Sequence, residues 1–337
     1  MSYTIKDIAR LAGVSKSTVS RVISGNGYTS KEAREKVLNA VKELQYKPNG
    51  VARAMVSQRT NNIGVIIYRQ HHPIASHPFY GKILDAILMK SESLNYSVFV
   101  TTDKEMSIRS ADFMLEKRVD GLILISRLSQ EVIGYIDHFN VPYLMVNGTA
   151  EKDDVIQIVN NDRKGGRIAA DHLYQLGHRR FLVIAGPQEH RSHHLRLQGF
   201  CERIHELGGN ISAKDIYFSP TSTFDDGYKG LSIIWDHFTS EKPTAIFATN
   251  DMLALGAMQV LLQNGWKIPD DMAVMGFDNI DYSKMSYPPL TTLHVEKMKM
   301  GEDAVVLLDR LIKKENLDPL RIEYDPVLII RESTKGV

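Results

Sequence analysis

The sequence of 337 residues has a single cysteine, Cys201, and no long hydrophobic run. One cysteine excludes an intrachain disulfide and a zinc site built on cysteine pairs, so we expect Cys201 to be a buried structural thiol. The sequence has no stretch of about 18 apolar residues and no apolar leader after the first methionine, which predicts neither membrane insertion nor secretion. We therefore expect a cytoplasmic protein with no membrane partner.

Catalytic signatures are absent too. There is no P-loop, no G-x-G-x-x-G fingerprint and no G-x-S-x-G elbow, and no nucleophile dyad or acid–base pair stands out. Two histidine groups, His71-His72 and His190 with His193-His194, lack a carboxylate at a metal-ligand spacing, so we interpret them as solvated loops. The sequence thus predicts no enzyme, no metal site and no cofactor other than a small-molecule effector.

The excess of basic residues is confined to the front of the chain. Residues 1–60 hold 11 Lys and Arg against 4 Asp and Glu, a net charge of +7, whereas the rest of the chain holds 30 against 36, a net charge of −6. The whole-chain net charge of +1 hides this asymmetry. It favours a polyanion as the partner of the first domain and not of the remainder.

The basic region has the sequence pattern of a helix-turn-helix. Thr4 and Asp7 form a capping box, which predicts a helix over residues 5–11. Gly13 lies at the centre of a short turn that needs a positive φ. Ser15 then caps a second helix that ends near residue 23.

The second helix has a packing face and a polar, basic face. With Val19 as the inward pole, Ser15, Val22 and Ile23 lie beside it, and a third helix over residues 31–45 completes a small core. Arginine can bind guanine with two hydrogen bonds in the major groove, and serine is small enough to allow close approach. The polar face consists of Lys16, Ser17, Ser20, Arg21 and Ser24. The alternative interpretation of this segment is an ordinary surface helix with solvated charges.

Residues 46–55 form a segment that is not expected to fold alone. Pro48 ends the preceding helix, and the good helix formers after it have almost no apolar face to bury. Such a segment would become ordered when it is held between DNA and a second copy of itself.

From residue 63 onward, apolar strands alternate with amphipathic helices. The pattern starts again near residue 155, which predicts two α/β halves, each a parallel sheet with helices on both faces. A ligand would bind between the halves, at the carboxyl ends of the strands. The predicted strands are 64–68, 96–101, 121–125, 143–146, 155–159, 181–185, 216–218, 245–248, 273–276 and 327–330, and the predicted helices are 79–94, 107–118, 130–139, 163–176, 196–207, 224–238, 252–264 and 296–313.

Four linked motifs resemble the headpiece and hinge of the lactose/galactose-repressor (LacI/GalR) family. They are Thr4-Ile5-Lys6-Asp7-Ile8-Ala9, Ala12-Gly13-Val14-Ser15, Thr18-Val19-Ser20-Arg21-Val22, and Pro48-Asn49 with Ala52-Arg53, and the resemblance continues to Arg331-Glu332-Ser333-Thr334. It implies that the hinge helices of a dimer pair in the minor groove and wedge an apolar side chain between base pairs, with Met55 at the position usually held by leucine. The residues expected to contact DNA are Thr4, Ser15, Lys16, Ser17, Ser20, Arg21, Ser24, Asn49, Ala52, Arg53 and Met55.

The resemblance also implies a domain plan. An all-α helix-turn-helix headpiece (1–46) is followed by a hinge helix and linker (47–60). The remainder (61–337) would be a two-lobed α/β core for ligand binding and dimerisation, similar to periplasmic sugar-binding proteins. Chain crossings between the lobes are expected near residues 160–162, 288–292 and 316–322. The first lobe then comprises about 61–160 plus 292–320, and the second about 161–290 plus 321–337.

Polar residues near the predicted strand ends indicate an effector site. Arg196 with Asn250 and Asp278 is a good set for binding sugar hydroxyls. By resemblance these three fall where sugar-contacting residues sit, Phe224 falls where an aromatic ring stacks on the pyranose, and Ser126 and Asn147 match other cleft positions. Ser76-His77-Pro78-Phe79-Tyr80 resembles the family's Asn-Pro-Phe segment, with His77 in place of asparagine. The expected effector-binding residues are His77, Phe79, Ser126, Asn147, Arg196, Phe224, Asn250 and Asp278.

Each of these residues also has a structural interpretation. Asp278 and Asp162 could cap helices or turns, Asn250 could satisfy loop backbone, and His77 could simply be exposed.

The sequence predicts a DNA-binding transcriptional regulator, a repressor of carbohydrate-utilisation genes. It would bind a pseudo-palindromic double-stranded DNA operator as a homodimer, with an affinity set by a sugar or sugar-phosphate effector. The alternative is a sugar-binding receptor of the periplasmic type without a regulatory role, which the basic front region and the missing leader disfavour. The identity of the sugar, its inducing or corepressing effect, and the involvement of a corepressor protein stay open.

Overall fold

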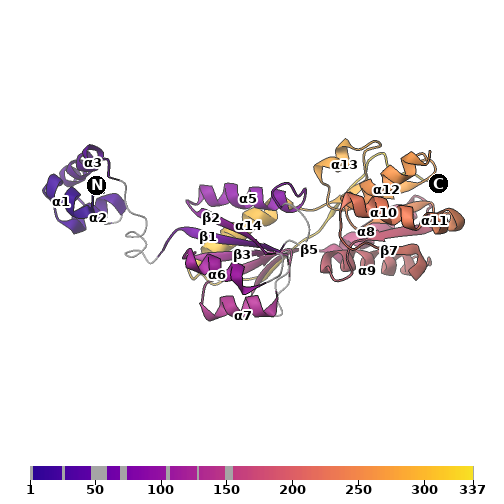
Figure 1. The fold of residues 1–337 in the computed structure, drawn as a ribbon, viewed down its shortest axis with the longest axis horizontal. Coiled ribbons are helices and arrows are strands. Elements are labelled where there is room, and N and C mark those ends of the chain that lie inside the picture. Colours follow the sequence, from indigo (N-terminus) through magenta and orange to yellow (C-terminus); the bar gives the residue numbers. More distant parts are fainter. Residues whose placement is uncertain are drawn as a thin grey trace. The chain divides into compact units, whose positions relative to one another are not determined.

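The computed structural model of the chain describes residues 3–24, 27–46, 59–68, 74–103, 107–126, 129–148 and 155–336 (Figure 1). The chain divides into two compact units, Met1–Thr60 and Asn61–Val337. The described part of the first unit is helical, and the strands belong to the second. Within these ranges no helix combines the length and the apolar character that a membrane crossing requires.

The described residues of the first unit form three short helices, α1 (Ile5–Ala12), α2 (Lys16–Ser24) and α3 (Lys31–Glu43). The Thr4 amide donates a hydrogen bond to the Asp7 carboxylate at 2.9 Å, which confirms the predicted capping box. Gly13 has a φ of +64°, so the turn between α1 and α2 uses the left-handed conformation that glycine adopts without strain. The helix-turn-helix therefore follows from local sequence signals.

The core of the first unit is small. Ile8, Val19 and Val37, one from each helix, are fully buried against one another. The third helix ends short of the predicted residue 45, because Gln45 adopts a φ of +45° and turns the chain. Tyr46, the last residue of the predicted headpiece, packs into this core.

The second unit contains a six-stranded parallel sheet with the strand order β11-β5-β4-β3-β1-β2. In β1, Val65 and Ile67 face one helical layer and Ile66 faces the other, so both faces of the strand are apolar. Its strands are β1 (Asn62–Tyr68), β2 (Ser97–Asp103), β3 (Gly121–Ile125), β4 (Tyr143–Val146), β5 (Ile156–Asn160) and β11 (Arg321–Tyr324). Helices α5 (Tyr80–Ser93) and α14 (Lys297–Ile312) cover one face, and α6 (Ile108–Glu116) and α7 (Gln130–His138) cover the other.

A second parallel sheet has the strand order β7-β6-β8-β9. Its strands are β6 (Phe181–Ala185), β7 (Ile216–Phe218), β8 (Ala245–Ala248) and β9 (Ala273–Met275). Helices α8 (Asp162–Gln175) and α9 (Arg191–Glu206) pack on one face, and α10 (Phe224–Ile233) and α12 (Asp251–Gln263) on the other. The short segments η1 (Ala213–Asp215), α11 (Trp235–Glu241) and α13 (Asp281–Met285) complete this half. Two α/β halves with helices on both faces confirm the predicted fold class.

Two of the predicted chain crossings are displaced. Residues 321–324 were assigned to the second lobe, but β11 pairs with β5 in the first sheet, so the third crossing follows Tyr324. Strand β10 (Thr292–His294) pairs antiparallel with β12 (Val327–Ile329) and continues the β9 edge through the bridge between Asp278 and His294. The second crossing therefore lies between β10 and α14. Alternating charges in β11 and the shortness of β10 hid both strands from a search for apolar runs.

Two helix boundaries also differ from prediction. Helix α9 begins at Arg191, whereas the sequence predicted a start at residue 196. His190, which precedes the helix, makes no side-chain capping hydrogen bond, so no capping signal in the sequence marks the earlier start. The predicted helix 224–238 is divided, with α10 ending at Ile233. Trp235 then packs edge to face against Trp266, with ring centroids 6.1 Å apart.

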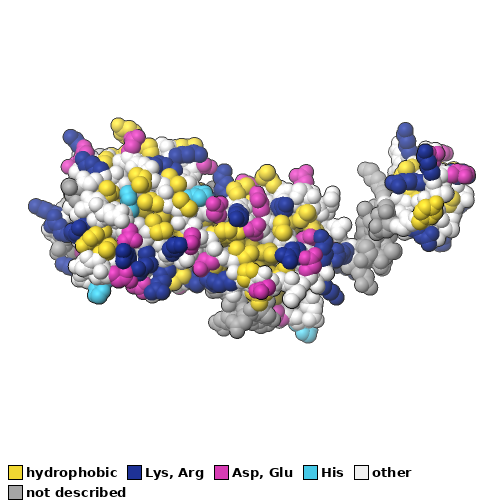
Figure 2. All heavy atoms as spheres, turned by 180° about the vertical axis from the view of Figure 1, so that it is seen from behind, with side chains coloured by type: hydrophobic (Ala, Val, Ile, Leu, Met, Phe, Trp, Pro, Cys, Tyr) yellow, Lys and Arg dark blue, Asp and Glu magenta, His cyan; other side chains and the backbone are white. Residues whose placement is uncertain are grey.

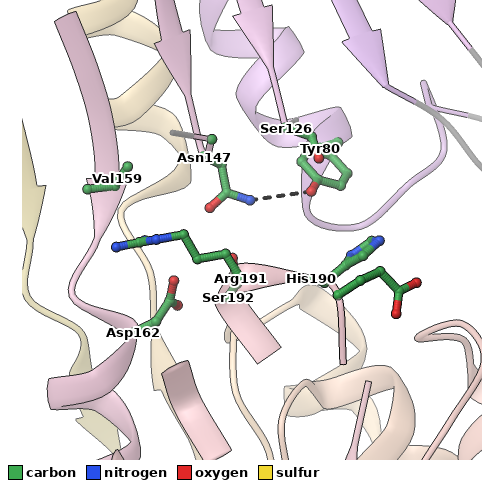
Figure 3. A pocket seen from close by; sticks show the side chains of 10 residues that line it. Tyr80, Ser126, Asn147, Val159, Asp162, His190, Arg191 and Ser192 are labelled. Carbon is green, nitrogen blue, oxygen red and sulfur yellow. Dashed lines mark hydrogen bonds between the residues drawn. The ribbon is translucent and has the colours of Figure 1, made fainter. Parts of the chain in front are cut away.

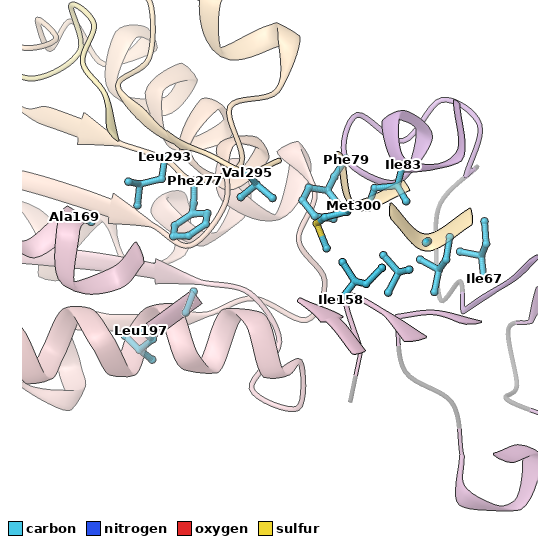
Figure 4. Close-up of a cluster of buried hydrophobic side chains, with 14 of the residues drawn as sticks. Ile67, Phe79, Ile83, Ile158, Ala169, Leu197, Phe277, Leu293, Val295 and Met300 are labelled. Carbon is cyan, nitrogen blue, oxygen red and sulfur yellow. The ribbon is translucent and has the colours of Figure 1, made fainter. Parts of the chain in front are cut away.

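One apolar cluster joins the two halves (Figure 4). Phe277 and Val295 lie next to the second sheet, and Phe79 and Met300 lie over the first sheet. The four side chains belong to the same cluster, which continues from one half to the other. All four are buried. The contact between the halves is therefore a packed core, on which polar residues at the strand ends can be positioned.

Charged side chains of both signs are interspersed over the face of the second unit shown in Figure 2, with apolar side chains between them. This mixture agrees with the small negative net charge of residues 61–337 and contrasts with the basic first unit.

Candidate functional sites

The exposed face of α2 is the candidate DNA-contacting surface. Lys16, Ser17 and Arg21 are exposed, whereas Val19 and Val22 on the other side are buried. Each polar side chain of this face can therefore reach a partner without unpacking the core. The structure brings these predicted residues together on one helix, as the helical periodicity indicated.

Two further predicted residues support the start of a helix. Ser15 accepts a hydrogen bond from the Thr18 amide at 3.1 Å, and its hydroxyl lies 2.9 Å from that of Thr18. The Thr4 hydroxyl donates a hydrogen bond to Asp7 at 2.8 Å, and the hydrogen bonds from Thr4 lower the pKa of the half-buried Asp7 carboxyl. Both residues are exposed, so their capping role leaves them accessible to a phosphate.

The remaining predicted DNA contacts are not all visible. Ser24 ends α2, and the side chains of Asn49, Ala52, Arg53 and Met55 fall outside the described residues. Tyr28, which is 90% exposed in the turn between α2 and α3, is a further accessible side chain of this unit that the sequence analysis did not select. An aromatic residue in an otherwise polar turn was the available signal.

A cavity of about 180 Å³ lies between the halves of the second unit (Figure 3). The first half contributes the residues that follow β3 and β4, the end of β5 and the start of α5. The second half contributes the first residue of α8 and the start of α9. The lining residues are Tyr80, Ser126, Asn147, Gly148, Val159, Asp162, Glu189, His190, Arg191 and Ser192.

Tyr80, Ser126 and Asn147 form the polar wall on the first half. The Asn147 amide donates to the Tyr80 hydroxyl at 3.3 Å, and Ser126 also hydrogen-bonds this hydroxyl. Ser126 and Asn147 both have positive φ values, +69° and +54°, because the chain turns sharply where each parallel strand ends. Burial raises the pKa of Tyr80, so its hydroxyl stays neutral and can donate or accept a hydrogen bond.

A buried ion triad supports the wall on the second half. Arg196 donates to Asp162 at 2.8 Å, lies 2.9 Å from the Asp278 carboxylate and stacks on the Phe277 ring at 3.8 Å. It also donates to the Thr249 carbonyl at 2.8 Å. Burial raises the pKa of Asp162 and of Asp278, and the charge of Arg196 opposes this shift. Arg196 and Asp278 thus hold Asp162 in the pocket wall but do not line the cavity themselves.

Both polar atoms of the Asn250 side chain form hydrogen bonds with backbone groups in this structure. Its side-chain oxygen accepts from the Leu253 amide at 2.9 Å and so caps α12, while its amide donates to the Ser222 carbonyl at 3.0 Å. These contacts agree with the interpretation of Asn250 as a residue whose side chain satisfies backbone groups. A ligand contact by Asn250 stays a prediction.

The other three predicted residues lie away from the cavity wall. The His77 ring nitrogen Nδ1 accepts from the Phe79 and Tyr80 amides, both at 3.2 Å, and so orients the start of α5. Phe79 is buried in the core between the halves. Phe224 lines a different cavity, described next. Of the eight predicted effector contacts, Ser126 and Asn147 line the pocket.

The second cavity, which we call the α12–α13 groove, has a volume of about 420 Å³. Large side chains around it are well exposed, with 54% for Tyr282, 69% for Met285 and 85% for Tyr287. An apolar groove rimmed by exposed aromatic and methionine side chains is typical of a protein–protein contact. It is lined by Phe224, Met252, Leu255, Met258, Gln259, Leu262, Tyr282, Met285, Ser286 and Tyr287.

Lys297 links the two halves through hydrogen bonds from its ammonium group. It is the first residue of α14 on the first sheet and is 7% exposed. Its ammonium group donates to the carbonyl oxygens of Val295, at 3.2 Å, and of Asp278. Burial lowers the pKa of Lys297, and the nearby Asp278 charge opposes this shift. A change at Asp278 can therefore be transmitted to α14.

Asp251 is a buried acid that sequence reasoning did not select. It accepts hydrogen bonds from the Thr292 hydroxyl at 2.5 Å and the Ile280 amide at 2.8 Å. Burial and the charge of Asp278 raise its pKa to about 8, so the folded protein holds a proton at Asp251 at neutral pH. The unfolded chain, with an ordinary carboxyl pKa of 3.8, does not.

This proton makes stability depend on pH. The contribution of Asp251 to the unfolding free energy is fully present below 3.8, the pKa of this carboxyl in the unfolded chain. It is lost as the pH rises to about 8, the pKa in the folded protein, and does not change further above that pH. We expect the difference in unfolding free energy between the wild type and Asp251→Asn to fall by up to about 1.4 kcal/mol per pH unit across that range. Urea unfolding at several pH values, followed by tryptophan fluorescence, measures this. A difference that does not change between pH 5 and 8 would contradict the prediction.

Comparisons with known proteins agree with this arrangement. Residues 4–49 match the model of a family described as bacterial regulatory proteins, lacI family, and residues 170–334 match a periplasmic binding protein-like domain. The chain is similar to the HTH-type transcriptional repressor PurR of Haemophilus influenzae (33% identity over 347 residues, 99% of both chains) and of Actinobacillus pleuropneumoniae serotype 3 (33% over 343 residues, 99% of both chains).

Solved structures show the same similarity over the whole chain. The lac repressor dimer bound to operator and the anti-inducer ONPF superimposes with a TM-score of 0.87 at 27% identity and covers 100% of both chains. A complex of the transcriptional regulator CelR with cellobiose has a TM-score of 0.76 at 28% identity, covering 98% of this chain and 100% of the other. The lac repressor bound to ONPG in the repressed state gives 0.84 at 27% identity, with coverages of 99% and 100%.

Proposed function

Because the chain belongs to the lacI family of bacterial regulatory proteins, we propose that it is a homodimeric repressor whose operator binding is controlled by a saccharide. Its membership makes it a DNA-binding transcriptional regulator with an effector domain. The observation that carries the proposal is the pocket lined by strand ends and helix starts of both halves, in a chain that begins with a helix-turn-helix.

The proposed domain plan keeps the headpiece, hinge and core bounds that the sequence predicts. We assign residues 1–46 to DNA binding, 47–60 to the hinge and linker, and 61–337 to effector binding and dimerisation. Strand pairing supports a first lobe that includes β11 and a second lobe that includes β10. The hinge contacts of Asn49, Ala52, Arg53 and Met55 remain part of the proposal.

The effector is proposed to be a saccharide held by hydroxyl and amide groups. CelR is solved with cellobiose and the lac repressor with ONPG. In this chain, Tyr80, Ser126 and Asn147 face the cavity from one half and Ser192 from the other. Such groups both donate and accept hydrogen bonds, which suits the paired donors and acceptors of a sugar. We propose no catalytic role for these residues.

Control of DNA binding requires the effector to favour one arrangement of the halves over another. The pocket residue Asp162 contacts Arg196, which contacts Asp278, whose carbonyl oxygen binds Lys297 on α14. This chain of contacts leads from the second half to the first. A ligand that moves Asp162 would therefore act on α14.

A second copy of the chain is the proposed occupant of the α12–α13 groove. The lac repressor is solved as a dimer bound to its operator. A dimer places two headpieces on one pseudo-palindromic site, so each half-site contact strengthens the other. The groove supplies the exposed apolar surface that such a contact requires.

Family membership favours this regulator over the periplasmic-type receptor considered from the sequence, because residues 4–49 match a regulatory headpiece. The protein is proposed to act in the cytoplasm, where its operator is.

Selection from a pool of random DNA duplexes tests the proposal directly. We expect the purified chain to enrich a pseudo-palindromic sequence, and a saccharide panel to change its affinity for that duplex. Retrieval of unrelated sequences only, with no common half-site, would contradict the operator function.

Arg21 is expected to determine part of the selected sequence. Its side chain is exposed on α2 and can bind guanine with two hydrogen bonds. Arg21→Ala should weaken binding to the selected duplex by about 1–3 kcal/mol and relax specificity at one base pair. Fluorescence anisotropy with the selected duplex and with single-base variants measures both effects. An equal loss on every duplex would instead identify Arg21 as a phosphate contact.

A further inference from the structure

Arg191 differs from the other arginines of the helix pair α8 and α9. Arg163 and Arg167 form ion pairs with Glu202 and Glu206, and Arg196 and Arg203 each contact two carboxylates. Arg191 lines the pocket but makes no hydrogen bond or ion pair with any residue that the structure describes. Its guanidinium group thus has its donors available where the ligand binds.

The two carboxylates that act on Arg191, those of Asp162 and Glu323, are bound by other arginines. Asp162 lies nearby, but its carboxylate is already bound by Arg196 at 2.8 Å and by Ser192. Arg321 on β11, bonded to Gln157 and to Glu323, adds a second cation on the other half. Burial and the charge of Arg321 lower the pKa of Arg191, whereas the charges of Asp162 and Glu323 oppose this shift.

The start of α9 adds to the positive potential. Arg191 is the first residue of this 16-residue helix, whose first turn contains no acidic residue. His190, which precedes it, makes no capping bond with its side chain. The free backbone amides and the helix dipole at this end favour an anion beside the guanidinium group.

The wall that the first half contributes is suited to neutral hydroxyl groups, whereas Asp162 and Glu189 add carboxylates to the lining. Tyr80, Ser126 and Asn147 are uncharged donors and acceptors on the wall formed by the first half. The volume of about 180 Å³ is below the roughly 300–1,000 Å³ of typical ligand pockets, which favours a single sugar ring over a longer saccharide.

We propose that the effector is a monosaccharide carrying an anionic group, a phosphate or a carboxylate, which Arg191 binds while the opposite wall binds the sugar hydroxyls. The proposal rests on the effector function proposed above and specifies its ligand class. Arginine suits both anions, because its planar fork matches their paired oxygens.

Matched sugars provide the test. Full-length protein is screened by thermal shift and then by calorimetry with glucose, galactose, mannose and fructose, each beside its 6-phosphate and the corresponding sugar acid. Inorganic phosphate and acetate serve as probes for binding of the anion alone. We expect at least one anionic sugar to raise the melting temperature while its neutral counterpart does not. The phosphate and carboxylate series identify which anion is bound.

Variants then assign the anion to Arg191. Arg191→Gln should weaken binding of that anionic sugar by about 10- to 100-fold, whereas Arg167→Gln, a paired surface arginine on α8, should not. Because the Arg191 side chain makes no described contact, its loss should leave the melting temperature without ligand unchanged.

Several outcomes would overturn the proposal. These are equal binding of neutral and anionic sugars, unchanged affinity in Arg191→Gln, a lowered melting temperature of that variant without ligand, binding of inorganic phosphate as tight as that of any sugar, or no shift by any anionic sugar at millimolar concentration. Binding of a neutral sugar that changes operator affinity would refute the anionic class and leave the proposed regulator intact.

Discussion

Replacement of Arg196 by leucine is expected to lower the unfolding free energy of the second unit by about 3–5 kcal/mol. Arg196 contacts Asp162 at 2.8 Å and Asp278 at 2.9 Å, and all three side chains are buried. Leucine fills part of the space but removes the cation that both carboxylates share. Each acid must then remain charged without this partner or take up a proton, and both are costly in a buried site.

The chain offers a direct measurement and a matched control. Its two tryptophans, Trp235 and Trp266, both lie in the half that contains the triad, so their fluorescence reports its unfolding in urea. Arg203 lies on the same helix and contacts Asp171 and Glu206, but these groups are partly exposed. Arg203→Leu should therefore cost no more than about 1 kcal/mol. Similar losses in the two variants would show that the triad contributes little.

Local signals predicted the headpiece well. The capping box at Thr4 and Asp7 and the positive φ at Gly13 depend on neighbours within a few residues. Strands 121–125, 181–185 and 245–248 were predicted with their observed bounds, because each is a short apolar run buried on both faces.

Long-range pairing was harder to predict. Strand β11 alternates charged and apolar residues, so its sequence does not show which sheet it joins, and its pairing with β5 is visible only in the fold. The crossing next to it was displaced for the same reason. Resemblance to a family indicated three crossings but could not position them to within a few residues.

The candidate pocket shows a different limit. Ser126 and Asn147 were found because they follow strands, whereas Arg191 and Ser192 were missed because nothing in the sequence marked the start of α9. Asn250 was selected for its type, yet its amide is used by Leu253 and Ser222. A sequence shows which hydrogen-bonding groups exist but not which of them neighbouring residues already occupy.

Two negative charges placed in the α12–α13 groove should make the protein monomeric and weaken operator binding by about 10²- to 10⁴-fold. Tyr282 and Met285 are 54% and 69% exposed at the groove, and a second copy that covers them would bury glutamates introduced there against apolar surface. A monomer holds one headpiece on one half-site, so the gain from linking two headpieces is lost. The loss should appear in the double variant Tyr282→Glu with Met285→Glu.

A control of the same chemistry uses Val327 on β12 and Ile330, which follows that strand; they are 54% and 65% exposed and lie outside the groove. Val327→Glu with Ile330→Glu should remain dimeric, since the added charge alone does not separate the copies. Sedimentation gives the oligomeric state of both double variants, and anisotropy gives their affinity for the full operator and for one half-site. Binding to one half-site should be the same in the groove variant and the wild type, because the headpiece is unchanged. A groove variant that stays dimeric would place the contact between copies on another surface.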